Sequence, residues 1–356
     1  MNFTGQLRSN EIFGALYNLI ISQEVFADNI KGSDLVDKAR VDGSLYGDTK
    51  LYYSTDALKS SAWGNDAEAT NLLQLFRPEA PDCQAIVIDV FRQIPLTTDQ
   101  YLSKRAWGDE GAFMNFTAVM KGWLSDTKKV YEGTTYNAFI GTMEGASANA
   151  TIEVALSDIT ATGEEKNRLE AEMIAEAVAN TITEMKDYTR DFNDYGHLRR
   201  YAEEDIKIIW NAKKVNKIKK IDLPSIFHNE GLIDKFAEEV LPAKYFGEVC
   251  TTNVTSAQKV SGKKYRALVE QLIGDNHYFP GDELKAADTA FANKAYVEDE
   301  DVICKIITKY PPYMSGFSVS TSFFNPKSLT ETNYVTFGHN TLEYLKGYPL
   351  TTLHAD

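Results

Sequence analysis

The residue types that most often bind metals or act as nucleophiles are sparse and scattered in this sequence. Its five histidines are His197, His228, His277, His339 and His354. None forms a His-Glu-x-x-His pair or stands at zinc-ligand spacing to a cysteine. Cys83, Cys250 and Cys304 are far apart and odd in number, which is typical of buried thiols in a reducing compartment. No Gly-x-Ser-x-Gly elbow marks a serine nucleophile. We therefore expect no catalytic residue and no metal site.

Two further segments resemble ligand-binding motifs without completing them. Ser261-Gly262-Lys263-Lys264 resembles the end of a P-loop, but Ala257 replaces the earlier glycine and Lys264 replaces the hydroxyl residue. The acidic run Glu298–Asp301 could attract a divalent cation, yet it lacks the glycine and the spacing of a calcium loop. A solvated acidic turn is the favoured interpretation, and no cofactor is expected.

One basic cluster is a candidate for contact with nucleic acid. It comprises Lys213, Lys214, Lys217, Lys219 and Lys220. Three of these lysines would share one face of a helix, but acidic residues flank the cluster on both sides, so local ion pairing is an equal explanation. The net charge of -14 opposes adhesion to DNA. Contact between Lys213–Lys220 and DNA stays open, and sequence-specific binding is not expected.

The composition describes a packed protein without a membrane segment. The chain has 356 residues, of which 43% are hydrophobic, and its mean hydropathy is -0.33. No run approaches the ~20 apolar residues that cross a bilayer. The first residues lack a basic leader and an uninterrupted apolar block, so we expect no secretory signal.

Helical and strand-like segments are mixed along the chain, which predicts an α+β fold. The clearest helical period lies over 109–131, where apolar residues recur every three or four positions; this predicts a helix ~35 Å long. The residues of that stripe are Phe113, Phe116, Met120, Trp123, Thr127 and Val130. Further helices are expected at 9–29, 66–75, 164–188, 212–221 and 231–240. Strands are expected at 84–93 (bounded by Pro81 and Pro95, with Thr97–Asp99 capping the next segment), 150–156, 205–211, 302–309, 317–324 and 333–338.

The segment Val36–Trp63 is predicted to be an extended arm that contains a two-stranded ribbon. Turn formers punctuate it, and Lys50–Ser54 has the composition of a strand. Such a ribbon is marginal when isolated in water. Its large apolar residues therefore need cover, either from the rest of the chain or from a neighbouring subunit, and the assembly interpretation depends on the second source. These candidate contact residues are Tyr46, Leu51, Tyr52, Tyr53 and Trp63.

Long segments, in order along most of the chain, resemble the major capsid proteins of tailed bacteriophages. They are LVDKARVDGSLYGDTKLYYSTD, CQAIVIDVFRQIPLTTDQYLSKRAWGDEGAF, TKKVYEGTTYNAFIG, IWNAKKVNKIKKIDLPSIFHNEGL, LPAKYFG and TNYVTFGHNTLEYLKGYPL. The resemblance implies the Hong Kong 97-type capsid fold. It further implies an N-terminal arm at 1–35, an E-loop region at 36–80, and a peripheral domain at 81–198 and 296–356 with a spine helix at about 109–131. The remaining 199–295 would form the axial domain.

The function implied by this resemblance is structural. The chain would self-assemble into pentamers and hexamers of an icosahedral head that encloses phage DNA, in the virion, after assembly in the bacterial cytoplasm. A separate scaffolding protein, a portal and decoration proteins are the implied partners, and no membrane is involved. Two alternatives stay open: an encapsulin-like nanocompartment shell, and an unrelated soluble α+β enzyme.

Overall fold

The computed structural model describes residues 31–43, 48–60, 75, 77–99, 110–219, 239–251, 294–299 and 301–356. Several expected features lie outside these residues. They are the helices at 9–29, 66–74 and 231–238, the P-loop-like segment Ser261–Lys264, His228, His277, Lys220, Tyr46 and Trp63. Within the described part, no helix combines the length and the apolarity that a membrane span requires.

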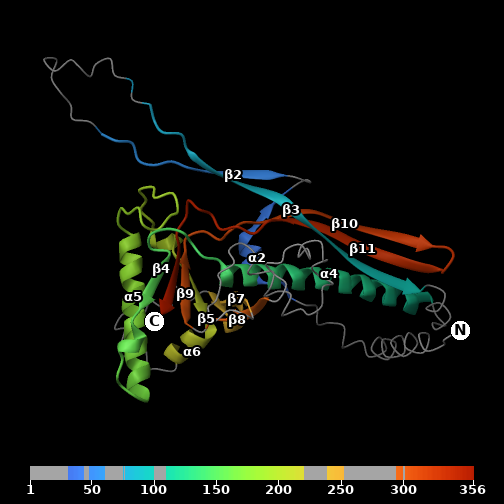
Figure 1. The fold of residues 1–356 in the computed structure, drawn as a ribbon. Helices are drawn as coiled ribbons and strands as arrows, with labels where there is room; N and C mark the ends of the chain where they lie inside the picture. The colour runs from blue at the N-terminus through green and yellow to red at the C-terminus, as the bar shows by residue number, and fades with distance from the viewer. Residues whose placement is uncertain are drawn as a thin grey trace.

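The described chain is built on two five-stranded sheets and one long helix (Figure 1). The first sheet has the order β1-β10-β11-β3-β2, with β1 (Arg40–Asp42), β2 (Thr49–Ser54), β3 (Asp82–Asp99), β10 (Tyr313–Asn325) and β11 (Thr330–Asn340). The second has the order β4-β12-β9-β5-β6, with β4 (Thr151–Val154), β5 (Lys207–Asn211), β6 (Glu239–Leu241), β9 (Val302–Ile307) and β12 (Leu350–Ala355). A separate pair joins β7 (Gly247–Thr251) to β8 (Lys294–Glu298).

The helices are α2 (Asp34–Ala39), α4 (Glu110–Thr142), α5 (Glu164–Met185) and α6 (Ala212–Lys219), with short 3-10 turns at Leu156–Asp158, Glu203–Asp205 and η5 (Ala243–Tyr245). Figure 1 shows β10, β11 and the second half of β3 running beside α4, whereas α5 lies against the second sheet. The apolar face of α5 packs with β5, β9 and β12 into one core that includes Val178, Ile182, Trp210 and Leu353. The mixed helices and sheets confirm the predicted α+β class.

Strand β3 is longer than predicted because it continues through a proline. Pro95 pairs with Tyr334 of β11, while β2 covers only residues 82–87 on the other side of β3. The backbone nitrogen of Pro95 therefore lies where β3 is an open edge, the position at which a strand tolerates proline. Placing a strand end at Pro95 and a helix cap at Thr97–Asp99 was wrong, because Thr97 Oγ1 instead meets Thr332 Oγ1 at 3.0 Å across the sheet.

Helix α4 is also longer than the predicted 109–131, and its buried face differs from the predicted stripe. It has 33 residues, or ~50 Å. Trp123, a member of that stripe, is 47% exposed, whereas Tyr136 and Ile140 are fully buried. Residues of the C-terminal half of α4 lie in one core with α2 and η5. The tail strands β9, β10 and β11 confirm the predicted return of the chain to a sheet.

A buried hydrogen-bond relay joins α4 to the first sheet. Arg92 Nε of β3 donates to Tyr131 Oη at 3.1 Å, and Tyr131 Oη lies 2.9 Å from His339 Nε2 of β11. His339 Nδ1 faces the Asn340 carbonyl oxygen at 2.8 Å. Since a carbonyl only accepts, Nδ1 carries the proton and Nε2 accepts from the tyrosine. The relay fixes the rotation of α4 against the sheet.

Two sequence predictions for short segments were wrong. Val240 belongs to strand β6 and not to a helix. Val36 lies in helix α2, where it is 2% exposed, so the extended segment begins at Arg40. The two strands of this extended segment, β1 and β2, do not pair with each other. Instead, β1 pairs in parallel with β10, and β2 pairs antiparallel with β3. The ribbon therefore joins β2 to residues some thirty positions later, a register that local turn residues do not reveal.

Candidate functional site

The β2–β3 ribbon presents one apolar face to solvent. Along β2, Leu51 and Tyr53 are 51% and 64% exposed. Their cross-strand partners are Ala85 and Cys83, both exposed, and Val87 is 38% exposed on the same face. We call these five residues the outer ribbon face. An apolar strand face that stays open is typical of a surface that another chain covers.

The opposite face of the ribbon is covered by its own chain. Tyr52 packs against a small core formed by Ile86, Ile88, Met314 and Leu345, and the ammonium of Lys309 lies 5.3 Å from the centre of its ring. Of the two sources of cover that the sequence left open, the rest of the chain thus covers this inner face. Of the five predicted contact residues, Leu51 and Tyr53 lie on the outer ribbon face, Tyr52 faces the protein, and Tyr46 and Trp63 are outside the described residues.

The end of the ribbon is held by the loop that follows α5. Arg190 Nη1 donates to Asp56 Oδ2 at 2.7 Å, and the Leu198 backbone N–H donates to Asp56 Oδ1 at 2.9 Å. Arg199 Nη2 donates to the Thr55 carbonyl oxygen. These bonds fix the point from which residues 57–60 lead away from both sheets (Figure 1). We call these contacts the arm-base clamp.

A serine, a histidine and an aspartate extend this clamp. Ser54 Oγ lies 2.8 Å from His197 Nδ1, and His197 Nε2 lies 3.0 Å from Asp82 Oδ2. The carboxylate can only accept, so Nε2 donates to it and Nδ1 accepts from the serine in the neutral ring. Ser54 and Asp82 face each other across the ribbon, and His197 therefore bridges both strands.

This triplet has the residue types of a hydrolase triad, but its geometry differs. In hydrolases the serine meets Nε2 and the aspartate meets Nδ1, whereas the two ring nitrogens are exchanged here. Ser54 also accepts from Arg199 Nη2 at 3.3 Å, and the Asp82 side chain is 50% exposed. The triplet is a structural bridge between two strands.

The charge on Asp56 gives the first prediction. Asp56→Asn keeps an acceptor oxygen for the backbone N–H groups but loses the ionic contact with Arg190, so the arm base should open more often. Hydrogen exchange at residues 55–58 should therefore accelerate at least about tenfold. Asp187→Asn is the control, since Asp187 also accepts a local backbone bond, from Tyr188 N–H at 2.7 Å. Equal exchange in both variants would contradict the clamp.

The same contact sets the pH range of the clamp. The Arg190 guanidinium, with the backbone N–H groups of Leu198 and Ala57, holds the pKa of Asp56 well below its ordinary value. Because the pKa is depressed in the folded chain, the clamp is complete above the ordinary carboxyl pKa of about 4 and weakens as the pH falls below it. Exchange at 55–58 should not change between pH 7 and 5 after correction for intrinsic rates.

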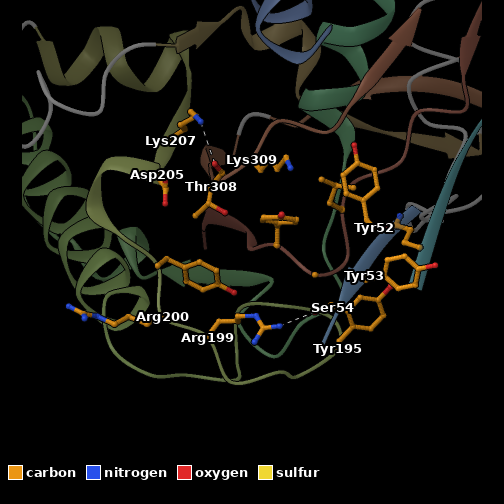
Figure 2. Close-up of a pocket in the computed structure, with 15 residues that line it drawn as sticks. Tyr52, Tyr53, Ser54, Tyr195, Arg199, Arg200, Asp205, Lys207, Thr308 and Lys309 are labelled. Carbon is orange, nitrogen blue, oxygen red and sulfur yellow. Dashed lines mark hydrogen bonds between the residues drawn. The ribbon is translucent and has the colours of Figure 1, made fainter. Parts of the chain in front are cut away.

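A groove lies between the ribbon and the arm-base clamp (Figure 2). Its volume is about 510 Å³. Tyrosines of β2 form one side and the 199–207 segment forms the other, while Lys309, which follows β9, lies beside Tyr52. The basic residues are Arg199, Arg200, Lys207 and Lys309, and Asp205 is the one carboxylate among the lining residues of the described chain.

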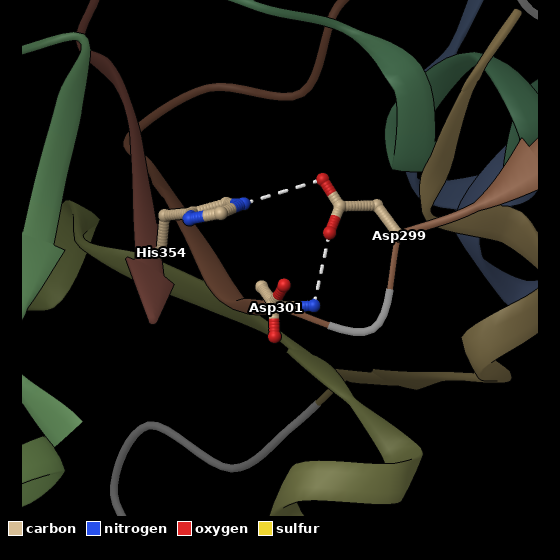
Figure 3. A group of neighbouring side chains, drawn as sticks. All are labelled: Asp299, Asp301 and His354. Atoms are coloured by element: carbon tan, nitrogen blue, oxygen red, sulfur yellow. Dashed lines mark hydrogen bonds and ion pairs between the residues drawn. The ribbon is translucent and has the colours of Figure 1, made fainter. Parts of the chain in front are cut away.

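The acidic run near residue 299 meets a histidine of the last strand (Figure 3). Ligand atoms of Asp299, Asp301 and His354 lie within 4.8 Å of one another. His354 Nε2 is 3.3 Å from Asp299 Oδ2, and the Asp301 backbone N–H donates to Asp299 Oδ1 at 2.9 Å. Both oxygens of Asp299 therefore already accept bonds. Hydrogen bonding to Asp299 raises the pKa of His354. The cluster ties the turn before β9 to β12, so Asp299 is not part of a freely solvated turn.

The structure also shows the surroundings of two of the cysteines and of the start of the basic helix. Cys304 is fully buried, and this burial raises the pKa of its thiol. Cys83 is exposed, contrary to the expectation of a buried thiol. At the start of the basic helix α6, the Lys213 backbone N–H donates to Asn211 Oδ1 at 3.0 Å, so Asn211 caps the helix. The side chains of Lys217 and Lys219 are not described.

Sequence reasoning missed the arm-base clamp and three of the five residues of the outer ribbon face, namely Cys83, Ala85 and Val87. Asp56, Arg190 and His197 are far apart in the chain, and no local pattern joins them. A signal did exist in β3, where buried Gln84, Ile86 and Ile88 alternate with exposed neighbours. The exposed set is also apolar, so the alternation is hidden in one continuous hydrophobic run.

Solved structures show which fold this arrangement belongs to. A chain in the capsid structure of Staphylococcus phage Andhra aligns over 93% of this chain and 86% of its own length, with a TM-score of 0.58 and 12% identity. A chain in a structure of the head fiber and inner core protein gp22 of native bacteriophage P68 aligns over 92% and 86%, with a TM-score of 0.62 and 11% identity. No protein-family model and no curated protein matches the sequence. The likeness confirms the fold that the resemblance implied: this chain has the Hong Kong 97-type fold of tailed-phage capsid proteins.

Proposed function

We propose that this protein is the major capsid protein of a tailed bacteriophage and that it acts as a structural and not a catalytic protein. The observation that supports this most directly is the outer ribbon face, an apolar strand surface that is exposed in the single chain although the ribbon is clamped to the body beneath it. In a protein with a capsid fold, the natural cover for such a face is a neighbouring copy of the same chain.

A second exposed apolar group supports the same role. Val319, Phe323 and Phe324 of β10 are 45–62% exposed, and Leu329 in the turn before β11 is 43% exposed. The register places Phe323 and Phe324 beside the Thr97–Asp99 end of β3, away from residues 82–87, which pair with β2, and the β10–β11 turn lies at that end of the sheet (Figure 1). Two apolar surfaces at opposite ends suit heterologous contacts, in which each copy uses one surface toward each neighbour and rings close by rotation.

We further propose an assignment of the parts of the capsid architecture to this chain. The ribbon and residues 36–80 would form the E-loop region, α4 the spine helix, and 81–198 with 296–356 the peripheral domain. Residues 1–35 and 199–295 would form the N-terminal arm and the axial domain. Pentamers and hexamers of this unit would close into an icosahedral head in the bacterial cytoplasm, with a separate scaffolding protein, a portal and decoration proteins as partners.

The decisive experiment is to measure the size and the content of the purified protein. We expect megadalton, closed shells by light scattering and negative-stain microscopy when the chain is produced together with its phage's scaffolding protein. Particles from infected cells should contain the phage genome. Shells filled with cargo enzymes would support the nanocompartment alternative instead, and a small oligomer under both conditions would contradict the proposal.

A further inference from the structure

The groove between the ribbon and the clamp has an excess of basic groups. Four basic side chains and one carboxylate line it, whereas the whole chain carries 51 acidic and 37 basic residues. Lys309 is exposed, and its ammonium lies 5.3 Å from the ring centre of Tyr52 and 5.1 Å from that of Tyr348. In the described part of the chain, no carboxylate lies within ion-pair distance of Lys309. The two rings hold the cation in place and leave its N–H groups directed to solvent.

The other groups around the groove point to an anionic ligand. Arg200 binds the Lys186 carbonyl oxygen through Nε at 2.8 Å, and its guanidinium is directed away from the centre of the groove (Figure 2), so it adds positive charge at the rim only. Thr308 is only 8% exposed and lines the groove. Its hydroxyl has no hydrogen-bond partner in the described part of the chain. A buried hydroxyl without a partner is costly, so a ligand that reaches it would satisfy it.

We propose that this groove is a receiving site for a carboxylate-bearing segment of a second copy of the chain, with Lys309 as the main contact. Two observations favour this occupant. The groove is continuous with the outer ribbon face, because Tyr53 belongs to both. A second copy also supplies the complementary charge, because the chain has a net charge of -14. The inference rests on the proposed function, since it identifies one contact by which shell subunits join.

Zero-length carbodiimide coupling tests this contact directly, because it joins an ammonium only to a carboxylate that touches it. Particles would be assembled from a mixture of ¹⁴N- and ¹⁵N-labelled chains. We expect Lys309 to be coupled to Asp or Glu of the other isotope. Lys166 is the internal control, since its Nζ lies 3.9 Å from Glu170 of the same helix; its coupling should stay within one isotope. Lys309 coupled only within its own chain, or not at all, would overturn the inference.

Variants give an independent measure. Lys309→Glu should lower the yield of particles at least tenfold, whereas Lys309→Arg and Lys166→Glu should keep it within twofold of the parent chain. Equal yields for Lys309→Glu and Lys166→Glu would contradict the inference while leaving the shell proposal intact. If the parent chain formed no particles, the proposed function and this inference would both fail. The two failures are therefore distinguishable.

The remaining occupant with suitable chemistry is a DNA phosphate. The extent to which Lys309 is acylated in filled and in emptied particles distinguishes a protein carboxylate from a DNA phosphate. Protection in both kinds of particle supports a protein carboxylate. Protection that disappears when the DNA is released would assign the groove to nucleic acid and overturn the inference.

Discussion

Replacing Leu51 and Tyr53 together with aspartate should abolish shell formation and leave a folded subunit. Both side chains are more than half exposed on the outer ribbon face, so they contribute little to the fold of the single chain. In an assembled interface they would be buried, and two desolvated carboxylates would each cost several kcal/mol there. We expect at least a 100-fold loss of particles by light scattering, with unchanged far-UV circular dichroism and thermal unfolding of the subunit.

The controls for this variant use the same chemistry at other positions. Tyr188→Asp changes a tyrosine that is 69% exposed and lies outside the ribbon, and particle yield should be retained. Tyr52→Asp should instead destabilise the subunit, because Tyr52 packs on Ile86, Ile88 and Leu345. Normal assembly of the Leu51/Tyr53 double variant would show that the outer ribbon face is not a subunit contact.

The two faces of this ribbon illustrate what could be predicted from the sequence. The strand composition of residues 50–54 predicts β2, and Leu51 and Tyr53, both candidate contacts, are exposed in the structure. The partner of β2 did not follow, because β3 is reached only after a long intervening segment, and the turn residues near Asp42 and Gly47 suggested a local hairpin. Side-chain direction in a strand depends on register, so an unknown partner leaves the face of Tyr52 unknown.

Periodicity predicted the long helices better than their buried faces. The period over 109–131 identified α4, but not its extension to Thr142, because Gly133 and Gly141 weaken the helical signal there. The structure shows why these glycines are compatible with a buried helix. A side chain at Gly133 would approach Ser33 Cβ at 3.1 Å, and one at Gly141 would overlap the backbone of Tyr245. Tertiary contact, which no local pattern contains, overrides the propensity.

Gly141→Ala should accordingly be among the most damaging single substitutions in this chain. An alanine Cβ at this position would lie 2.1 Å from the Tyr245 carbonyl oxygen and 2.6 Å from the carbonyl carbon. Both are backbone atoms of η5, which is held between β6 and β7, so no side-chain rotation relieves the overlap. We expect a loss of about 3 kcal/mol or more in the free energy of unfolding, measured by urea denaturation of unassembled subunits.

The matched control lies in the same helix. Gly122 is exposed, and a Cβ there would meet no atom within 4 Å. Gly122→Ala should therefore stabilise the subunit by about 0.5–1 kcal/mol, through helix propensity alone. The same substitution thus changes the free energy of unfolding in opposite directions at two positions of α4. Helix propensity decides the effect at the exposed position, and contact with the backbone decides it at the buried one. If both variants were stabilised, the close packing of α4 on η5 would be wrong, and with it the position of the segment that begins at β6.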